Sequence, residues 1–128
     1  MANGFHGTRD EWSAMEAPIK QLDERIAAFA SKNRMNVSND TRNAPGRSIE
    51  WREGGIDRLI QIYFDRESQT GLSLWVAATM DVKGKRHWKN IFLKRGADPL
   101  EFESDLEKYL EEGKRLVGSW DEKDLEPA

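Results

Sequence analysis

The sequence predicts an α+β fold with two layers, in the order helix, four-stranded antiparallel meander, helix, with both helices on one face of the sheet. Apolar residues recur at helical spacing near both ends of the chain, and between these ends they alternate with a period of two. A chain of 128 residues suits one domain with one core. We therefore expect a flexible N-terminus at 1–7, a single domain at 8–118 and an acidic C-terminal tail at 119–128.

The first helix is predicted between residues 8 and 33. Its apolar stripe has steps of three and four residues and consists of Trp12, Met15, Ile19, Leu22, Ile26 and Phe29. Thr8 followed by Glu11 is typical of a capping box at a helix start. Pro18 lies inside the stripe and removes one backbone hydrogen bond. Because the stripe continues through Pro18, we expect one helix kinked there rather than two helices.

Residues 33–47 are polar and rich in turn formers, and they predict a loop with a short edge strand at 35–37. The four main strands are then expected at 48–53, 56–66, 72–82 and 85–94. Three turns should join these four strands: Gly54–Gly55, the three-residue loop 69–71, and Lys83–Gly84.

These turns set the strand registers. They place Ile49 opposite Ile60, Ile60 opposite Met80, and Val76 opposite Ile91, and they also place Leu74 opposite Leu93. All three registers agree on one apolar face. The predicted core face consists of Ile49, Trp51, Ile60, Ile62, Phe64, Leu72, Leu74, Val76, Met80, Ile91 and Leu93.

The second helix has the clearest start in the chain. Asp98 is the expected cap, Pro99 takes the first helical position, and Glu101 closes a capping box. Gly118 can end this helix. We expect the last ten residues to be frayed, with Trp120 able to fold back as a stopper.

The opposite, open face of the predicted sheet suggests a binding surface. Its candidate binding residues are Tyr63, Trp75, Thr79, Trp88, Asn90 and Phe92. Exposed aromatic patches are often interaction sites, because Trp and Tyr offer a large contact area at small entropic cost. The same aromatics can instead be cross-strand pairs that only stiffen the sheet. We expect binding of a protein partner, or homodimerisation, through this face.

Two alternatives stay open. A small-molecule or catalytic pocket between the sheet and the first helix would have Trp51, Arg58 and His87 near its rim. An RNA-binding sheet also sets aromatics beside basic residues, and residues 83–90 contain four Lys or Arg. However, the net charge of -3 and the carboxylates of the open face argue against nucleic acid.

Composition further limits the function. The chain has no cysteine and only two histidines, which lie far apart in the sequence, so we expect no disulfide, metal site or cofactor. No nucleophile, phosphate-binding or dinucleotide motif occurs, and we expect no catalytic residues and no enzyme activity. No apolar run resembles a signal or a membrane span, so we expect a cytoplasmic protein without membrane contact.

Overall fold

The computed structural model describes residues 7–39, 44–65 and 71–127. In these residues the helices are α1 (Arg9–Lys20), α2 (Asp23–Lys32), α3 (Pro99–Ser104) and α4 (Leu106–Gly118), with a short 3-10 helix η1 (Glu122–Asp124). The strands are β1 (Asn36–Ser38), β2 (Gly46–Glu53), β3 (Ile56–Asp65), β4 (Gly71–Val82), β5 (Lys85–Ala97) and β6 (Glu126–Pro127). Within this part of the chain, no helix is both long and apolar enough to cross a lipid bilayer.

All six strands form one open antiparallel sheet in the order β1-β2-β3-β4-β5-β6. Every strand is therefore paired with its neighbours in the sequence. The predicted α+β class and antiparallel sheet are confirmed. The four expected main strands correspond to β2, β3, β4 and β5. The short edge strand expected at 35–37 is found as β1, one residue later, whereas β6 at the other edge was not predicted.

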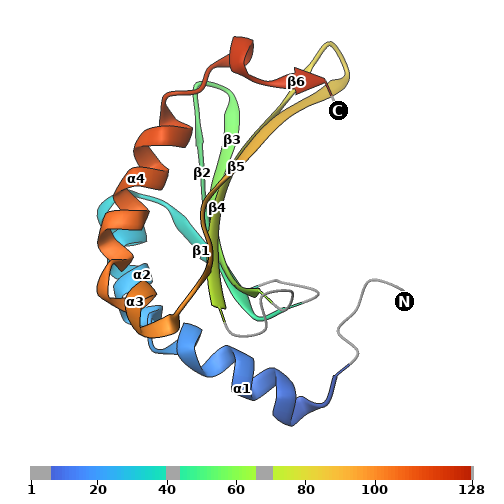
Figure 1. Ribbon diagram of the computed structural model, residues 1–128. Coiled ribbons are helices and arrows are strands. Elements are labelled where there is room, and N and C mark those ends of the chain that lie inside the picture. Colours follow the sequence, from blue (N-terminus) through green and yellow to red (C-terminus); the bar gives the residue numbers. More distant parts are fainter. Residues whose placement is uncertain (1–6, 40–43, 66–70, 128) are drawn as a thin grey trace.

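The helices leave one face of the sheet open. In Figure 1, α2, α3 and α4 lie on one side of the curved sheet, and α1 lies at one end of it. The opposite, concave side is not covered by any of these helices. Contacts connect α2 with β1 and α4 with β3 and β4, so the core forms between these elements.

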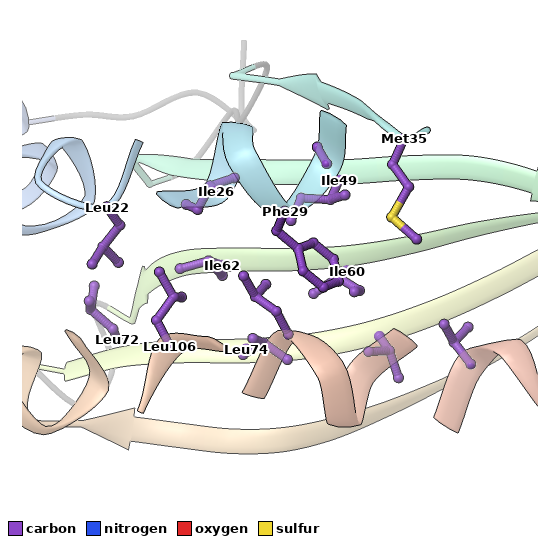
Figure 2. Close-up of a cluster of buried hydrophobic side chains, with 14 of the residues drawn as sticks. Leu22, Ile26, Phe29, Met35, Ile49, Ile60, Ile62, Leu72, Leu74 and Leu106 are labelled. Carbon is purple, nitrogen blue, oxygen red and sulfur yellow. The ribbon is translucent and has the colours of Figure 1, made fainter. Parts of the chain in front are cut away.

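The core is made of aliphatic side chains from both layers. Figure 2 shows Leu22, Ile26 and Phe29 of the N-terminal helical region directed toward the strands. Ile60, Leu74 and Val76 on the central strands are fully buried. Gly113 of α4 has no side chain, and a Cβ added there would lie 3.1 Å from Val76 Cγ1. The glycine therefore allows α4 to approach the sheet closely.

The first helical region is divided, which corrects the expectation of one helix kinked at Pro18. Pro18 lies inside α1, and the break follows it at Gln21 and Leu22. There the backbone tightens, with the Leu22 amide donating to the Ile19 carbonyl oxygen at 2.9 Å. The apolar stripe continues across the break, because Ile19, Leu22 and Ile26 are all buried. The predicted Thr8 cap is confirmed, since its hydroxyl accepts from the Glu11 amide at 3.0 Å.

The strand registers were predicted in part. Ile49 lies opposite Ile60, and Val76 lies opposite Ile91, as expected. Ile60 lies opposite Val76 and not opposite Met80. The turn that joins β3 to β4 is longer than predicted, since Asp65 pairs with Gly71; its predicted residues Gln69 and Thr70 lie outside the described residues.

Two expectations for β5 also need correction. Leu74 lies opposite Lys94 rather than Leu93, because register shifts interrupt the pairing of β4 and β5 at this point. Ile91 was expected in the core, but 38% of its surface is exposed. The reason is that α4 covers β3 and β4, and the middle of β5 lies beyond it.

The C-terminal region is more ordered than expected. Asp98 caps α3, accepting from the Leu100 amide at 2.9 Å, and Pro99 takes the first helical position as predicted. The helix is interrupted at Asp105, and α4 then runs to Gly118. The following residues are not frayed, since η1 and β6 form there. Trp120 and Leu125 are both buried against the core.

Candidate functional site

The open face is the side of the sheet that points away from α2, α3 and α4. Strand alternation and the observed registers place on it Glu50, Leu59, Gln61, Tyr63, Trp75, Ala77, Thr79, Trp88, Asn90 and Phe92. On β3 and β4 the small or polar residues Gln61, Ala77 and Thr79 stand beside Leu59, Tyr63 and Trp75, and β5 adds Trp88 and Phe92.

Two of the predicted residues form an aromatic pair. Trp75 on β4 lies opposite Phe92 on β5, and their ring centroids are 6.1 Å apart at an interplanar angle of 28°. The Trp75 indole N–H donates to Gln61 Oε1, and the Gln61 amide nitrogen donates to Ser48 Oγ at 3.1 Å. This chain of hydrogen bonds fixes the orientation of the indole ring.

Arg95 completes this group, and the sequence pattern did not identify it. With regular alternation, Arg95 would point to the helix side, together with Ile91. The register shift near Leu74 places it on the open face, where its guanidinium lies 4.7 Å from the centroid of Phe92 and 4.0 Å from Asp65 Oδ2. The stack resembles a cation–π contact. A bulge of this kind leaves no periodic signal in the sequence.

The other predicted binding residues lie around this pair. Thr79 is opposite Trp88, and Asn90 is opposite Ala77. Tyr63 lies farther along β3, opposite Ser73, and is half-buried. The structure therefore brings Trp75 and Phe92 into contact and places Thr79, Trp88 and Asn90 on adjoining positions, with Tyr63 at one end.

The residues of the open face differ in solvent exposure. Trp88 is 42% exposed and Phe92 is 43% exposed, although both are large apolar side chains. Trp75 is half-buried and Ala77 is buried. Trp88 and Phe92 therefore present the accessible aromatic area, and Trp75 on the neighbouring strand packs beside Phe92.

A hollow of about 380 Å³ lies over β2, β3 and β4, and it reaches Thr79, which lies opposite Trp88. It is lined by Asn36, Glu50, Trp51, Arg52, Asp57, Arg58, Leu59, Ala77 and Thr79. Most of these residues belong to the open face, among them Ala77 and Thr79 with their small side chains. We refer to this space as the hollow.

Of the three residues predicted for the alternative pocket, two line the hollow and His87 lies elsewhere. Trp51 and Arg58 lie opposite one another on β2 and β3, and both contribute to the hollow. His87 lies opposite Met80 and Pro127 and does not belong to the described lining of the hollow. Arg58 is buried and donates to the backbone carbonyl oxygens of Val117 and Trp120, so its guanidinium serves the end of α4.

The rim of the hollow carries charges of both signs. Arg52 Nη1 lies 3.7 Å from Asp57 Oδ1, and both side chains are largely exposed. Glu50 adds a second carboxylate to this rim. Over the described residues, His, Asp and Glu side chains do not gather in a group of three or more that could hold a metal ion.

Comparison with known proteins adds no functional information. No family model, no curated protein and no solved structure matches the chain. The function is therefore inferred from the open face itself.

Proposed function

We propose that the protein acts by binding another protein through the open face. One observation carries this proposal: Trp88 and Phe92 expose 42% and 43% of their surface on the concave side of the sheet, beside a hollow of about 380 Å³. Large exposed aromatics that cluster on one face are typical of interaction sites, where they fill pockets of a partner.

The aromatic group is also held rigid before binding. Gln61 positions the Trp75 indole by a hydrogen bond, and both Trp75 and Arg95 pack against the ring of Phe92. A surface with few rotamers to lose on association has a smaller entropic cost of binding. The order of this group thus favours recognition by a structured partner over a purely solvent-exposed role.

The charges of the face favour a protein over a nucleic acid. Glu50 and Asp57 place carboxylates at the hollow, and only Arg52 opposes them on its exposed rim. A phosphate backbone would approach two like charges there. A protein partner can meet this rim with its own mixture of polar and basic side chains.

A small molecule bound in the hollow is the second candidate. Its volume of about 380 Å³ lies within the range that is usual for ligand sites, about 300–1,000 Å³. In this candidate, Leu59, Ala77 and Thr79 would form the floor and the charged rim would orient the ligand.

The test compares Trp88→Ala with Leu100→Ala as a matched control. Leu100 is a large apolar residue with 76% of its surface exposed, but it belongs to α3, away from the open face. The tagged proteins are used to capture partners from a nuclease-treated lysate, and native mass is measured for each.

We expect wild type and Leu100→Ala to hold the same stoichiometric protein partner and Trp88→Ala to lose it. Equal capture by both variants would contradict the proposal. If no protein is captured, ligand screening by thermal shift, with Thr79→Arg to fill the hollow, tests the second candidate.

A further inference from the structure

The outer edge of β5 is a second surface with the properties of a binding site. β6 pairs with β5 only at two positions, His87 with Pro127 and Trp88 with Glu126. From Lys89 to Ala97, no strand in the described part of the chain pairs with this edge. An unpaired edge presents backbone N–H and C=O groups that can hydrogen-bond to another extended chain.

Apolar side chains flank this edge on both faces of the sheet. Ile91, on the helix side, is 38% exposed, and its neighbour Phe92, on the open face, is 43% exposed. A strand added beside them would place alternate side chains against each of the two. An added strand can therefore make an apolar contact on whichever face carries its own apolar side chains.

The charge of β5 indicates what kind of strand fits. Residues 85–97 contain five Lys or Arg and no Asp or Glu. Basic residues and bulges commonly protect a sheet edge against pairing with a copy of itself, because like charges then face one another. The same charges attract an acidic segment. The edge is therefore selective, and a second copy of this chain is the less suitable occupant.

The chain itself provides an example of this pairing. β6 is an extended segment that contains Glu126, and it adds to β5 antiparallel, with Glu126 opposite Trp88. An acidic residue is thus accommodated at the edge of the basic strand. Beyond this point, toward Ala97, no further strand of the described residues pairs with the same edge.

We propose that the edge of β5 from Lys89 to Ala97 binds an extended acidic segment of a partner protein, which adds to the sheet as a further strand. This inference goes beyond the proposed function, because it concerns the edge of β5 rather than the open face, and it names a class of partner and its mode of binding. Backbone hydrogen bonds would provide affinity, and the alternation of acidic and apolar side chains would provide specificity.

The probe is an end-blocked eight-residue peptide of alternating Val and Glu, titrated into the intact protein with amide NMR detection. The first control replaces each Glu with Lys, and the second N-methylates alternate backbone nitrogens of the acidic peptide. We expect shifts and slowed hydrogen exchange at amides of 89–97, with both controls at least about tenfold weaker. Lys94→Glu, checked for an unchanged amide spectrum elsewhere, should weaken the acidic peptide similarly.

The outcomes separate this inference from the proposed function. Trp88→Ala should still bind the acidic peptide, because Trp88 already pairs with Glu126 of β6 and lies outside the edge from Lys89 to Ala97. Absence of peptide binding, or equal binding of all three peptides, would overturn the strand addition but leave the open face untouched. A dimer of the chain that protects the β5 amides would assign the edge to a second copy instead.

Discussion

The guanidinium of Arg58 donates a hydrogen bond of 2.9 Å to the backbone carbonyl oxygen of Trp120. It also donates to the carbonyl oxygen of Val117, within the last turn of α4, and to that of Glu53 at 3.2 Å. The last carbonyl groups of a helix lack intrahelical partners, and a cation at this end also interacts favourably with the helix dipole. A buried β3 residue therefore anchors the end of α4 and the segment that follows it.

Replacing Arg58 should be strongly destabilising. In Arg58→Met the carbonyl oxygens of Val117 and Trp120 lose their donor inside the protein, and we expect the free energy of unfolding to fall by about 3 kcal/mol. Urea denaturation measures this change. Arg52→Met is the control, because Arg52 is 70% exposed and its ion pair with Asp57 is solvated, so we expect a change below about 0.5 kcal/mol. Equal effects in both variants would contradict the role of Arg58.

Gly71 should not tolerate a side chain. A Cβ added there would lie 2.3 Å from the backbone carbonyl carbon of Gly96, and a backbone neighbour cannot rotate away. We expect Gly71→Ala to lower the free energy of unfolding by about 3 kcal/mol. Gly118→Ala provides the matched control, because nothing lies within 4 Å of its added Cβ, and it should be neutral or slightly stabilising in a thermal melt.

The two aspartates around α3 should differ in their contribution. The Asp98 side chain accepts from the amides of Leu100 and Glu101, so Asp98→Ala should cost about 1 kcal/mol. Asp105 takes the corresponding position before α4 but makes no side-chain capping hydrogen bond. Asp105→Ala should therefore change the stability little. Chemical denaturation of the Asp98→Ala and Asp105→Ala variants measures both free energies of unfolding. A larger loss in Asp105→Ala than in Asp98→Ala would contradict the capping assignment.

The ion pair between Arg25 and Glu107 should contribute to acid sensitivity. The Arg25 guanidinium donates to both Glu107 carboxylate oxygens, and this lowers the pKa of Glu107 below its ordinary value of 4.5. A lowered folded-state pKa gives stability that is present above the unfolded pKa and is lost as the pH falls through the folded value.

The size of this effect should be small. The Glu107 side chain is 58% exposed, so solvent screens the pair, and we expect a contribution below about 1 kcal/mol. Unfolding curves of wild type and Glu107→Gln should differ at pH 7 and converge as the pH falls below about 4.5. A constant difference across this pH range would show that the effect of the substitution is not electrostatic.

The sequence was most informative where local geometry determines the structure. Gly54 and Gly55 fit a two-residue turn, and the register that this turn implies for Ile49 and Ile60 is the one observed. The β3–β4 register differs from the prediction by four residues along β4, since Ile60 lies opposite Val76 instead of Met80. An even shift keeps every side chain on its predicted face. For this reason Tyr63 on β3 shares a face with Trp75 on β4, as predicted. Between β4 and β5 the register itself was predicted correctly here, with Trp75 opposite Phe92 and Thr79 opposite Trp88.

The remaining features depend on tertiary contacts. Helix breaks at Leu22 and Asp105 leave the apolar stripes intact, so periodicity does not detect them. β6 has only two residues, which is too short for an alternating pattern. The hydrogen bonds of Arg58 to the end of α4 join groups 59 and 62 positions apart, and no local pattern indicates them.

The order of the sheet has a consequence for folding kinetics. Because each strand pairs with the next one in the sequence, the sheet can form through successive hairpins, and each closes only a short loop. Contacts of large sequence separation join α2 with α4, as in the pair of Arg25 and Glu107, 82 positions apart. We expect the sheet to form early and the docking of α2 beside α4 to limit the folding rate.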